Sequence, residues 1–122
     1  QVWVNGMLIS FDARNRGLSG GIPQNIGSLD SLFSLYLSDN YLTGELPSGI
    51  FTLTNLYSLH ISGNQLSGEI LPVICMMLDN WETDGFNPNR SYLDNNKFCK
   101  GETGYPECIE PFVGEQDTSN CF

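Results

Sequence analysis

The chain has 122 residues, of which 40% are apolar, and a formal net charge of −9 at neutral pH. This length suits one small domain. An acidic chain repels phosphate groups, so electrostatic binding of nucleic acid or of an anionic membrane surface is excluded. No apolar run is long enough to span a membrane. The sequence begins without a signal peptide, so if the protein is secreted we expect this sequence to be its mature form or a fragment.

A β-hairpin is the first element that the sequence predicts. The apolar segments 2–4 and 8–11 flank Asn5-Gly6, and Asn-Gly is the dipeptide most typical of a two-residue hairpin turn. Such a hairpin would cover the first layer of the core. Two alternatives stay open for this end, namely upstream residues or a second chain, because an uncovered strand edge invites pairing.

A 24-residue repeat fills the middle of the chain. Residues 29–52 and 53–76 coincide when one segment is shifted onto the other, with apolar residues at the same offsets. An irregular copy precedes them, with Arg16 in place of the asparagine, and a last copy with about eight additional residues ends at Phe98. A fixed period in the twenties with leucines at set offsets predicts a stacked solenoid.

Each copy is expected to contain one short strand and one asparagine turn. In residues 35–37 and 59–61, apolar residues alternate with Tyr36 or His60, which predicts that the leucines point inward and these rings point outward. The asparagine follows where the chain must turn, and its short amide can bond backbone groups that no strand serves. The expected asparagine ladder consists of Asn40, Asn64 and Asn96.

Residues 35–50 read LYLSDNYLTGELPSGI, which resembles the plant-type leucine-rich repeat of receptor-kinase ectodomains and polygalacturonase inhibitors. The resemblance implies an α/β repeat solenoid, a short right-handed superhelix with a parallel β-sheet on its concave face and 3-10 turns and loops on its convex face. It also implies a binding role, without one particular ligand. The C-terminal region is similar to the ends of such arrays in secreted bacterial proteins, in the segments NNKFC, YPECI and VGEQDTSNC. We expect a repeat array over residues 1–98 and a disulfide-closed cap over residues 99–122.

All four cysteines lie where the array ends. An even number of cysteines in a small domain predicts two disulfides and an oxidising, extracellular compartment. Three pairings are open, and we favour Cys75–Cys99, which spans one repeat length, together with Cys108–Cys121, which ties down the tail. Zinc binding is the rival interpretation, but no CxxC pair occurs and the only histidine lies in another repeat.

Side chains that point outward from successive strands fall into columns, because neighbouring strands lie about 4.8 Å apart. Aromatic rings bordered by hydroxyls suit a protein or peptide partner, which would use the rings as anchors, or a glycan, which would stack on them. A third interpretation is that strand-face positions vary freely and bind nothing. The candidate ligand-binding residues are Asp12, Phe33, Ser34, Tyr36, Tyr57, Ser58, His60 and Tyr92.

Two short motifs lie between the last two copies. Residues 80–85 read NWETDG, with oxygen ligands at alternating positions as in a calcium loop, but the twelfth position is Ser91 rather than glutamate. Asn89 begins the glycosylation sequon NRS, which matters only in a host that glycosylates such sites. Trp81 and Phe86 are expected to cover the last layer of the core.

The sequence therefore predicts an extracellular, non-enzymatic module that recognises a protein or peptide in preference to a glycan. The alternative is a structural unit that self-associates through the thinly capped ends of the array. Nothing supports catalysis, since the sequence lacks a GxSxG motif, a phosphate-binding glycine loop and a carboxylate placed in an apolar cleft. We expect no cofactor and no metal.

Overall fold

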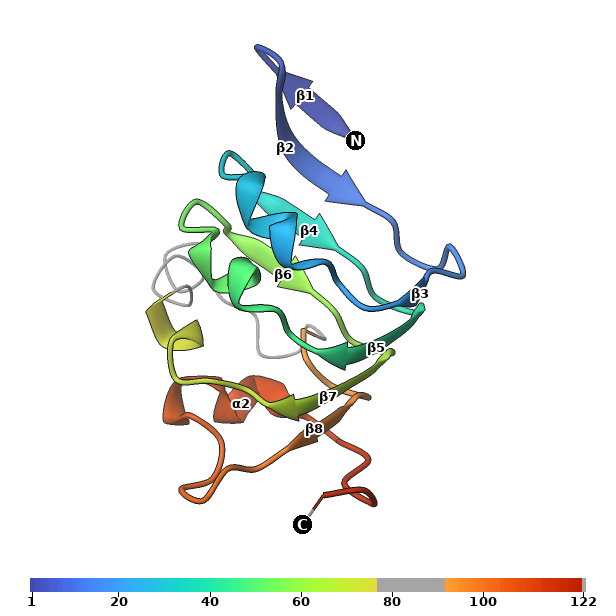
Figure 1. Ribbon diagram of the computed structural model, residues 1–122, viewed down its shortest axis with the longest axis vertical. Coiled ribbons are helices and arrows are strands. Elements are labelled where there is room, and N and C mark those ends of the chain that lie inside the picture. The colour runs from blue at the N-terminus through green and yellow to red at the C-terminus, as the bar shows by residue number, and fades with distance from the viewer. Residues whose placement is uncertain (77–91, 122) are drawn as a thin grey trace.

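The computed structural model describes residues 1–76 and 92–121. Within these ranges the chain winds into stacked coils, as the repeat predicts (Figure 1). A central coil carries a strand, the asparagine turn, a second strand and a 3-10 helix, in that order. The N-terminal hairpin lies at one end of the stack and the C-terminal cap at the other (Figure 1).

One four-stranded sheet carries the candidate binding face. Its order is β1-β2-β4-β6, with the bounds Val2–Val4, Met7–Asp12, Ser34–Tyr36 and Ser58–His60. β1 and β2 form the predicted antiparallel hairpin, and its two turn residues both have positive φ, as an Asn-Gly turn requires. β2, β4 and β6 are parallel, and each residue pairs with the one 24 positions later, which confirms the period.

A second sheet lies on another side of the coils, where the resemblance implied loops. Its strands are parallel and follow the order β3 (Ser19–Gly20), β5 (Tyr41–Glu45), β7 (Gln65–Glu69) and β8 (Lys97–Cys99). Leu42 and Leu66 are buried in these strands, whereas the residues on either side of them are more exposed. This period of two is the strand signal that the sequence analysis overlooked.

Short 3-10 helices return the chain to the next coil, as the resemblance implied. They are η1 (Gln24–Ser28) and η2 (Ser48–Thr52), each preceded by a proline in extended conformation. A Cβ atom on Gly49 would collide with the Gln24 carbonyl of the preceding coil. Glycine therefore lets the two helical turns stack at close range.

Aliphatic side chains from successive coils fill the space that the two sheets and the 3-10 helices enclose. Burial of each such side chain stabilises the fold by roughly 1.5–3 kcal/mol relative to exposure. The fully buried residues include Leu32, Leu35, Ile50, Leu53, Leu56, Leu59, Ile61 and Leu66.

The predicted asparagine ladder is present and buried. Asn64 accepts a hydrogen bond from the Leu42 N–H (3.0 Å) and donates to the carbonyls of Leu37 (3.0 Å) and Ile61 (3.1 Å). One amide thus serves backbone groups of two successive coils. The members Asn40, Asn64 and Asn96 are 5%, 7% and 1% exposed.

The first turn keeps the backbone of the later ones, although it lacks the ladder asparagine. Asn15 has a φ of 54°, close to the 60° of Asp39 at the equivalent place in the next coil. Asn40 of that coil accepts hydrogen bonds from the N–H groups of Arg16 (2.9 Å) and Leu18 (3.0 Å). The first turn therefore differs from the later ones in lacking the side-chain amide of the ladder asparagine, which Arg16 replaces, and not in its backbone conformation.

The C-terminal cap closes the last layer with η3 (Glu107–Ile109) and α2 (Glu110–Val113). Ile109 and Val113 point into the core, with 0% and 4% of their surface exposed. They replace the leucines that a further coil would supply.

Gln116 continues the asparagine ladder into the cap. Its Oε1 accepts a hydrogen bond from the Phe98 N–H (3.1 Å), and its Nε2 donates to the carbonyls of Leu93 and Val113 (both 2.8 Å). Sequence analysis missed this residue because glutamine is not part of the repeat pattern.

The two predicted disulfides are present, but the predicted pairing is wrong. The structure joins Cys75 to Cys108 and Cys99 to Cys121. β5 pairs with β7 at an offset of 22 residues and β7 with β8 at an offset of 30, so the last coil is eight residues longer. A residue 24 positions after Cys75 is therefore not stacked against it, and Cys99 lies beside Glu69 instead.

Because all four cysteines are paired, the zinc interpretation is wrong.

The calcium-like motif of residues 80–85, the sequon at Asn89, and Trp81 and Phe86 lie outside the described residues. In the ranges that the structure describes, no helix has the length and apolar character needed to cross a membrane. The same ranges contain no group of three histidine, cysteine or acidic side chains that could hold a metal ion.

Candidate functional site

A row of aromatic rings crosses the outward face of the first sheet. The parallel register places Tyr36 beside His60, and the hydrogen bond from the Ile61 N–H to the Tyr92 carbonyl (2.9 Å) brings Tyr92 next to His60. The ring centroids are 4.9 Å apart for Tyr36 and His60 and 4.8 Å apart for His60 and Tyr92. We call these three residues the ring row. The 24-residue repeat places Tyr36 beside His60, and Tyr92 holds the equivalent place in the last coil, which is eight residues longer.

A charged pair lies at the start of the ring row. The Arg14 guanidinium donates two hydrogen bonds to Asp12, from Nε to Oδ1 (2.9 Å) and from Nη2 to Oδ2 (2.7 Å). These bonds lower the pKa of Asp12 from its ordinary value of 3.8 and raise the pKa of Arg14. The guanidinium carbon also lies 4.8 Å from the centroid of the Tyr36 ring, within cation–π range. At the Tyr36 end of the ring row, a charged Asp12–Arg14 pair therefore lies against an aromatic ring.

The cap supports the other end of the ring row. The Tyr92 ring meets Phe112 of α2 edge-on, with centroids 5.8 Å apart. Tyr92 is only 6% exposed, so the expectation that it contacts a ligand is wrong. The Tyr92 ring packs against His60 instead. Sequence analysis missed Phe112, because Phe112 lies outside the repeat and no repeat position predicts its packing.

Phe33 and Tyr57, which directly precede β4 and β6, form a second aromatic pair. Their rings stack with centroids 4.5 Å apart and planes inclined by 16°. The two strands are locked there, because the Tyr57 N–H donates to the Phe33 carbonyl (2.7 Å). Phe33 is 46% exposed, the largest exposed fraction among the aromatic candidates. The pair is a flat apolar platform on a rigid backbone.

The serines contribute less than the sequence predicted. Ser34 is 7% exposed and its Oγ lies 2.6 Å from the Ser10 Oγ, so its hydroxyl is not offered to a ligand. Strands about 4.8 Å apart leave little room around a small side chain between large ones. The Ser58 Oγ lies 3.1 Å from the His60 Nε2, and Ser58 is half-buried. Ser58 orients the histidine ring.

Without Tyr92, Ser34 and Ser58, the candidate binding surface consists of aromatic and imidazole rings with a charged pair at one border. Its members are Asp12, Arg14, Phe33, Tyr36, Tyr57 and His60, and we call this surface the strand face. A face of this kind supplies apolar contact area and a few hydrogen-bonding tips. The carboxylate on it, Asp12, is 43% exposed and is paired with Arg14, which does not suit the raised pKa of a general acid.

The repeat region matches the Leucine Rich Repeat family model over residues 31–53 and 55–77. A comparison with curated protein sequences finds no significant match.

Solved plant structures share the fold. A chain of the BIR3–SERK2 complex from Arabidopsis thaliana is 30% identical with a TM-score of 0.68, and the alignment covers 92% of this chain and 54% of that one. The BIR2 ectodomain from Arabidopsis thaliana is 30% identical with a TM-score of 0.62, covering 80% and 46%. The ectodomain of the receptor kinase SOBIR1 from Arabidopsis thaliana is 28% identical with a TM-score of 0.58, covering 71% and 43%.

The chain spans about half the length of these solved structures. The stacked repeats of the structure agree with the family model and with the structural likeness. The chain is a leucine-rich-repeat protein of the plant type.

Proposed function

We propose that the chain is an extracellular, non-enzymatic recognition module that binds an extended segment of a protein or peptide along the strand face. The observation that carries this proposal is the ring row together with the Phe33–Tyr57 platform. Phe33, Tyr36, Tyr57 and His60 present their rings there, each within 5 Å of a neighbouring ring, and the buried Tyr92 packs against His60. Tyrosine and arginine are enriched among residues that dominate protein interfaces.

Rigidity supports the same proposal. The rings stand on strands whose backbone groups pair with both neighbouring coils, so little conformational entropy is lost when a partner binds. A surface that is already ordered pays less for association than a flexible loop does. Alternating side chains of an extended segment would then contact successive rings.

Similar proteins support a protein or peptide partner. The BIR3–SERK2 structure is itself a complex of two proteins. The receptor RGFR1, described as a plant peptide hormone receptor, was solved with RGF2, and it is 28% identical with a TM-score of 0.54 over 75% of this chain and 13% of that one. Two disulfides favour an oxidising compartment.

The test uses the folded chain against a panel of purified secreted proteins, synthetic peptides and glycans. We expect at least one protein or peptide to bind. The triple variant Tyr36→Ala/Tyr57→Ala/His60→Ala should weaken that binding by roughly 30-fold or more, because anchor residues each contribute about 2 kcal/mol or more. The measurement is the Kd from surface plasmon resonance.

A matched control separates loss of anchors from loss of fold. Tyr41, Leu71 and Val73 are 62%, 48% and 37% exposed. Tyr41 lies in β5 of the second sheet, and Leu71 and Val73 follow β7 of that sheet, so their triple alanine variant should bind normally. Circular dichroism should show both variants folded. Binding of glycans alone, or unchanged affinity of the first variant, contradicts the proposed function.

A further inference from the structure

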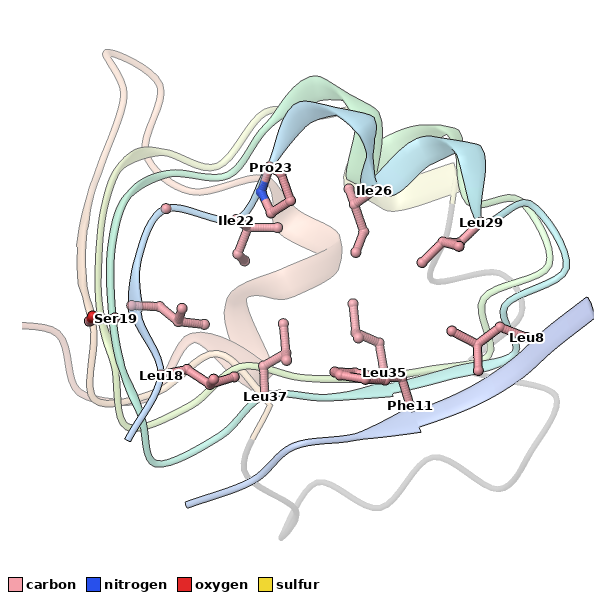
Figure 2. Close-up of a pocket in the computed structure, with 12 residues that line it drawn as sticks. Leu8, Phe11, Leu18, Ser19, Ile22, Pro23, Ile26, Leu29, Leu35 and Leu37 are labelled. Atoms are coloured by element: carbon pink, nitrogen blue, oxygen red, sulfur yellow. The ribbon is translucent and has the colours of Figure 1, made fainter. Parts of the chain in front are cut away.

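A polar groove lies on the outward face of the second sheet. Figure 2 shows Leu18, Ile22 and Leu37 pointing into the interior of the coils, whereas alternate residues of a strand point the other way. The groove has a volume of about 590 Å³ and is lined by residues of β5, β7 and β8 and of the C-terminal tail, residues 118–121. Both cysteines of the Cys99–Cys121 disulfide belong to this lining, so a dissolved reagent can approach the bond.

The other disulfide has different surroundings. Cys75 and Cys108 pack against the hydrophobic core. Along the chain, Cys108 is also flanked by two exposed acidic residues, Glu107 and Glu110, which repel an approaching anion. The reagent that cleaves a disulfide is a thiolate anion, and it needs access to a sulfur atom. The Cys75–Cys108 bond is therefore the more protected of the two.

Both lysines of the chain line the polar groove. Lys97 and Lys100 flank Cys99 in the sequence, and Lys97 lies on the same face of β8 as Cys99 because they are two residues apart in one strand. Glu69 is the acidic residue of the lining, so two lysines and one glutamate give the groove a net positive charge. Ammonium groups attract the attacking thiolate and stabilise the thiolate that leaves.

The Cys99–Cys121 disulfide also fastens the tail. The first three tail residues are exposed, and in the part of the chain that the structure describes the hydrogen bonds of the tail run within it or to the Asp117 side chain. The last backbone bond to the array before the tail runs from the Asp117 N–H to the Asn96 carbonyl (2.8 Å). The cap before this point has its own disulfide and its own buried side chains, so it does not depend on the tail.

We infer that Cys99–Cys121 is a site of reversible thiol–disulfide exchange that latches the tail against the second sheet. The thiolate of a dithiol attacks the Cys121 Sγ, a mixed disulfide forms, and Cys99 leaves as a thiolate beside the two lysines and takes up a proton. The second thiol of the reagent then displaces Cys121. The protein gains two electrons and two protons, and the dithiol becomes a disulfide.

Reduction frees the tail and widens the groove. The wall that Asn120 and Cys121 provide is lost, which exposes more of the outward face of the second sheet. The strand face belongs to the other sheet and is unchanged. The device is therefore separate from the proposed recognition site.

Differential alkylation of the folded chain tests the inference. The chain is treated with dithiothreitol without denaturant, and free thiols are blocked at intervals and located by mass spectrometry of peptides. We expect Cys99 and Cys121 to become free at least about ten times faster than Cys75 and Cys108, because access and local charge both favour the first pair. Equal rates, or faster release of Cys75 and Cys108, would overturn the inference.

Hydrogen exchange shows what reduction releases. After selective reduction, the amides of residues 118–121 should exchange faster while the circular dichroism spectrum stays the same. The variant Cys99→Ser/Cys121→Ser should reproduce both results without a reductant. Unchanged exchange in the tail, or loss of the folded spectrum in the variant, would contradict the latch.

The lysines are tested by their effect on the rate. Lys97→Gln/Lys100→Gln should slow the reduction of Cys99–Cys121 by about threefold or more, since the thiolates are no longer stabilised by positive charge. Arg16→Gln is the matched control, because Arg16 is an exposed cation outside the groove, and it should leave the rate unchanged. Equal rates for the two variants would overturn the role assigned to the lysines.

Discussion

Asn64 forms hydrogen bonds with four backbone groups of two successive coils. Its side chain bonds the Leu42 N–H and the carbonyls of Leu37, Ile61 and Ser62, and the residue is 7% exposed. An alanine in its place would remove the partner of the buried Leu42 N–H, and an unpaired buried donor is costly. The three carbonyls would lose one donor each but keep another, from Asn40, Asn96 and the Asp39 N–H respectively. The ladder is therefore a stability determinant as well as a turn signal.

Asn64→Ala should lower the free energy of unfolding by about 2–4 kcal/mol. Asn55 provides the control, since it is exposed and makes one side-chain hydrogen bond, to the Asp30 carbonyl (2.9 Å). Asn55→Ala should cost less than about 1 kcal/mol. Urea denaturation followed by circular dichroism measures both values. Equal losses for the two variants would contradict the role of the ladder.

Residue positions were predictable from the sequence wherever the repeat is regular. Tyr36 and His60 meet because equal offsets in a parallel sheet place like residues side by side. The burial of Tyr92 was not predictable, because it depends on Phe112 from a segment outside the repeat. Ser34 is buried with its Oγ 2.6 Å from the Ser10 Oγ, and the repeat pattern does not predict this contact.

At the scale of elements, close contact between successive 3-10 helices sets the distance between coils. Gly27 and Gly49 face each other across η1 and η2, and a Cβ on either would collide with backbone atoms of the other helix. Neighbouring strands lie about 4.8 Å apart. The 3-10 helices of successive coils can approach each other closely enough to match this distance only because both positions lack a side chain.

Gly49→Ala should therefore destabilise the fold by about 1–3 kcal/mol, as an overpacked contact does. At Gly21 a Cβ would meet only the Thr43 carbonyl, at 3.7 Å, which is an ordinary contact distance. Gly21→Ala should change stability by less than about 1 kcal/mol. Thermal unfolding of both variants checks the contrast, and a neutral Gly49→Ala would mean that the helical turns are not in contact.

The disulfides fasten the cap to the array. Cys75–Cys108 links residues 33 positions apart and Cys99–Cys121 links residues 22 positions apart. Peptide mapping without reduction should recover these two linkages. Replacing both Cys75 and Cys108 with alanine should cost about 2–5 kcal/mol. A Cys75–Cys99 peptide would contradict the structure.

Sequence analysis identified the elements of the array but not the geometry of its end. The hairpin follows from a local turn signal and the strands from a fixed period, both of which a single sequence displays. The pairing of the cysteines depends on where the longer last coil places η3, and counting 24 residues from Cys75 ignores that length. The second sheet was overlooked because its alternation is short and is interrupted by Gly44 and Gly68.

At the scale of the whole molecule, stacking of the coils brings side chains from separate copies of the repeat together on one continuous surface. Two successive coils each contribute one ring to the ring row and one to the platform, and the last coil adds Tyr92 to the ring row. No coil alone could present the ring row or the platform. The strand face therefore exists only if the coils stack in the observed register, and both the fold and the proposed recognition depend on that register.

Nuclear Overhauser effects between aromatic side chains test this claim most directly, and they need no partner. The structure predicts cross-peaks between the rings of Tyr36 and His60, whose centroids lie 4.9 Å apart, and between those of Phe33 and Tyr57, at 4.5 Å. A spectrum in which the Tyr36 ring instead contacts the buried leucines Leu35 and Leu59 would place it on the opposite side of the sheet. That result would contradict the register, the strand face and the function proposed for it.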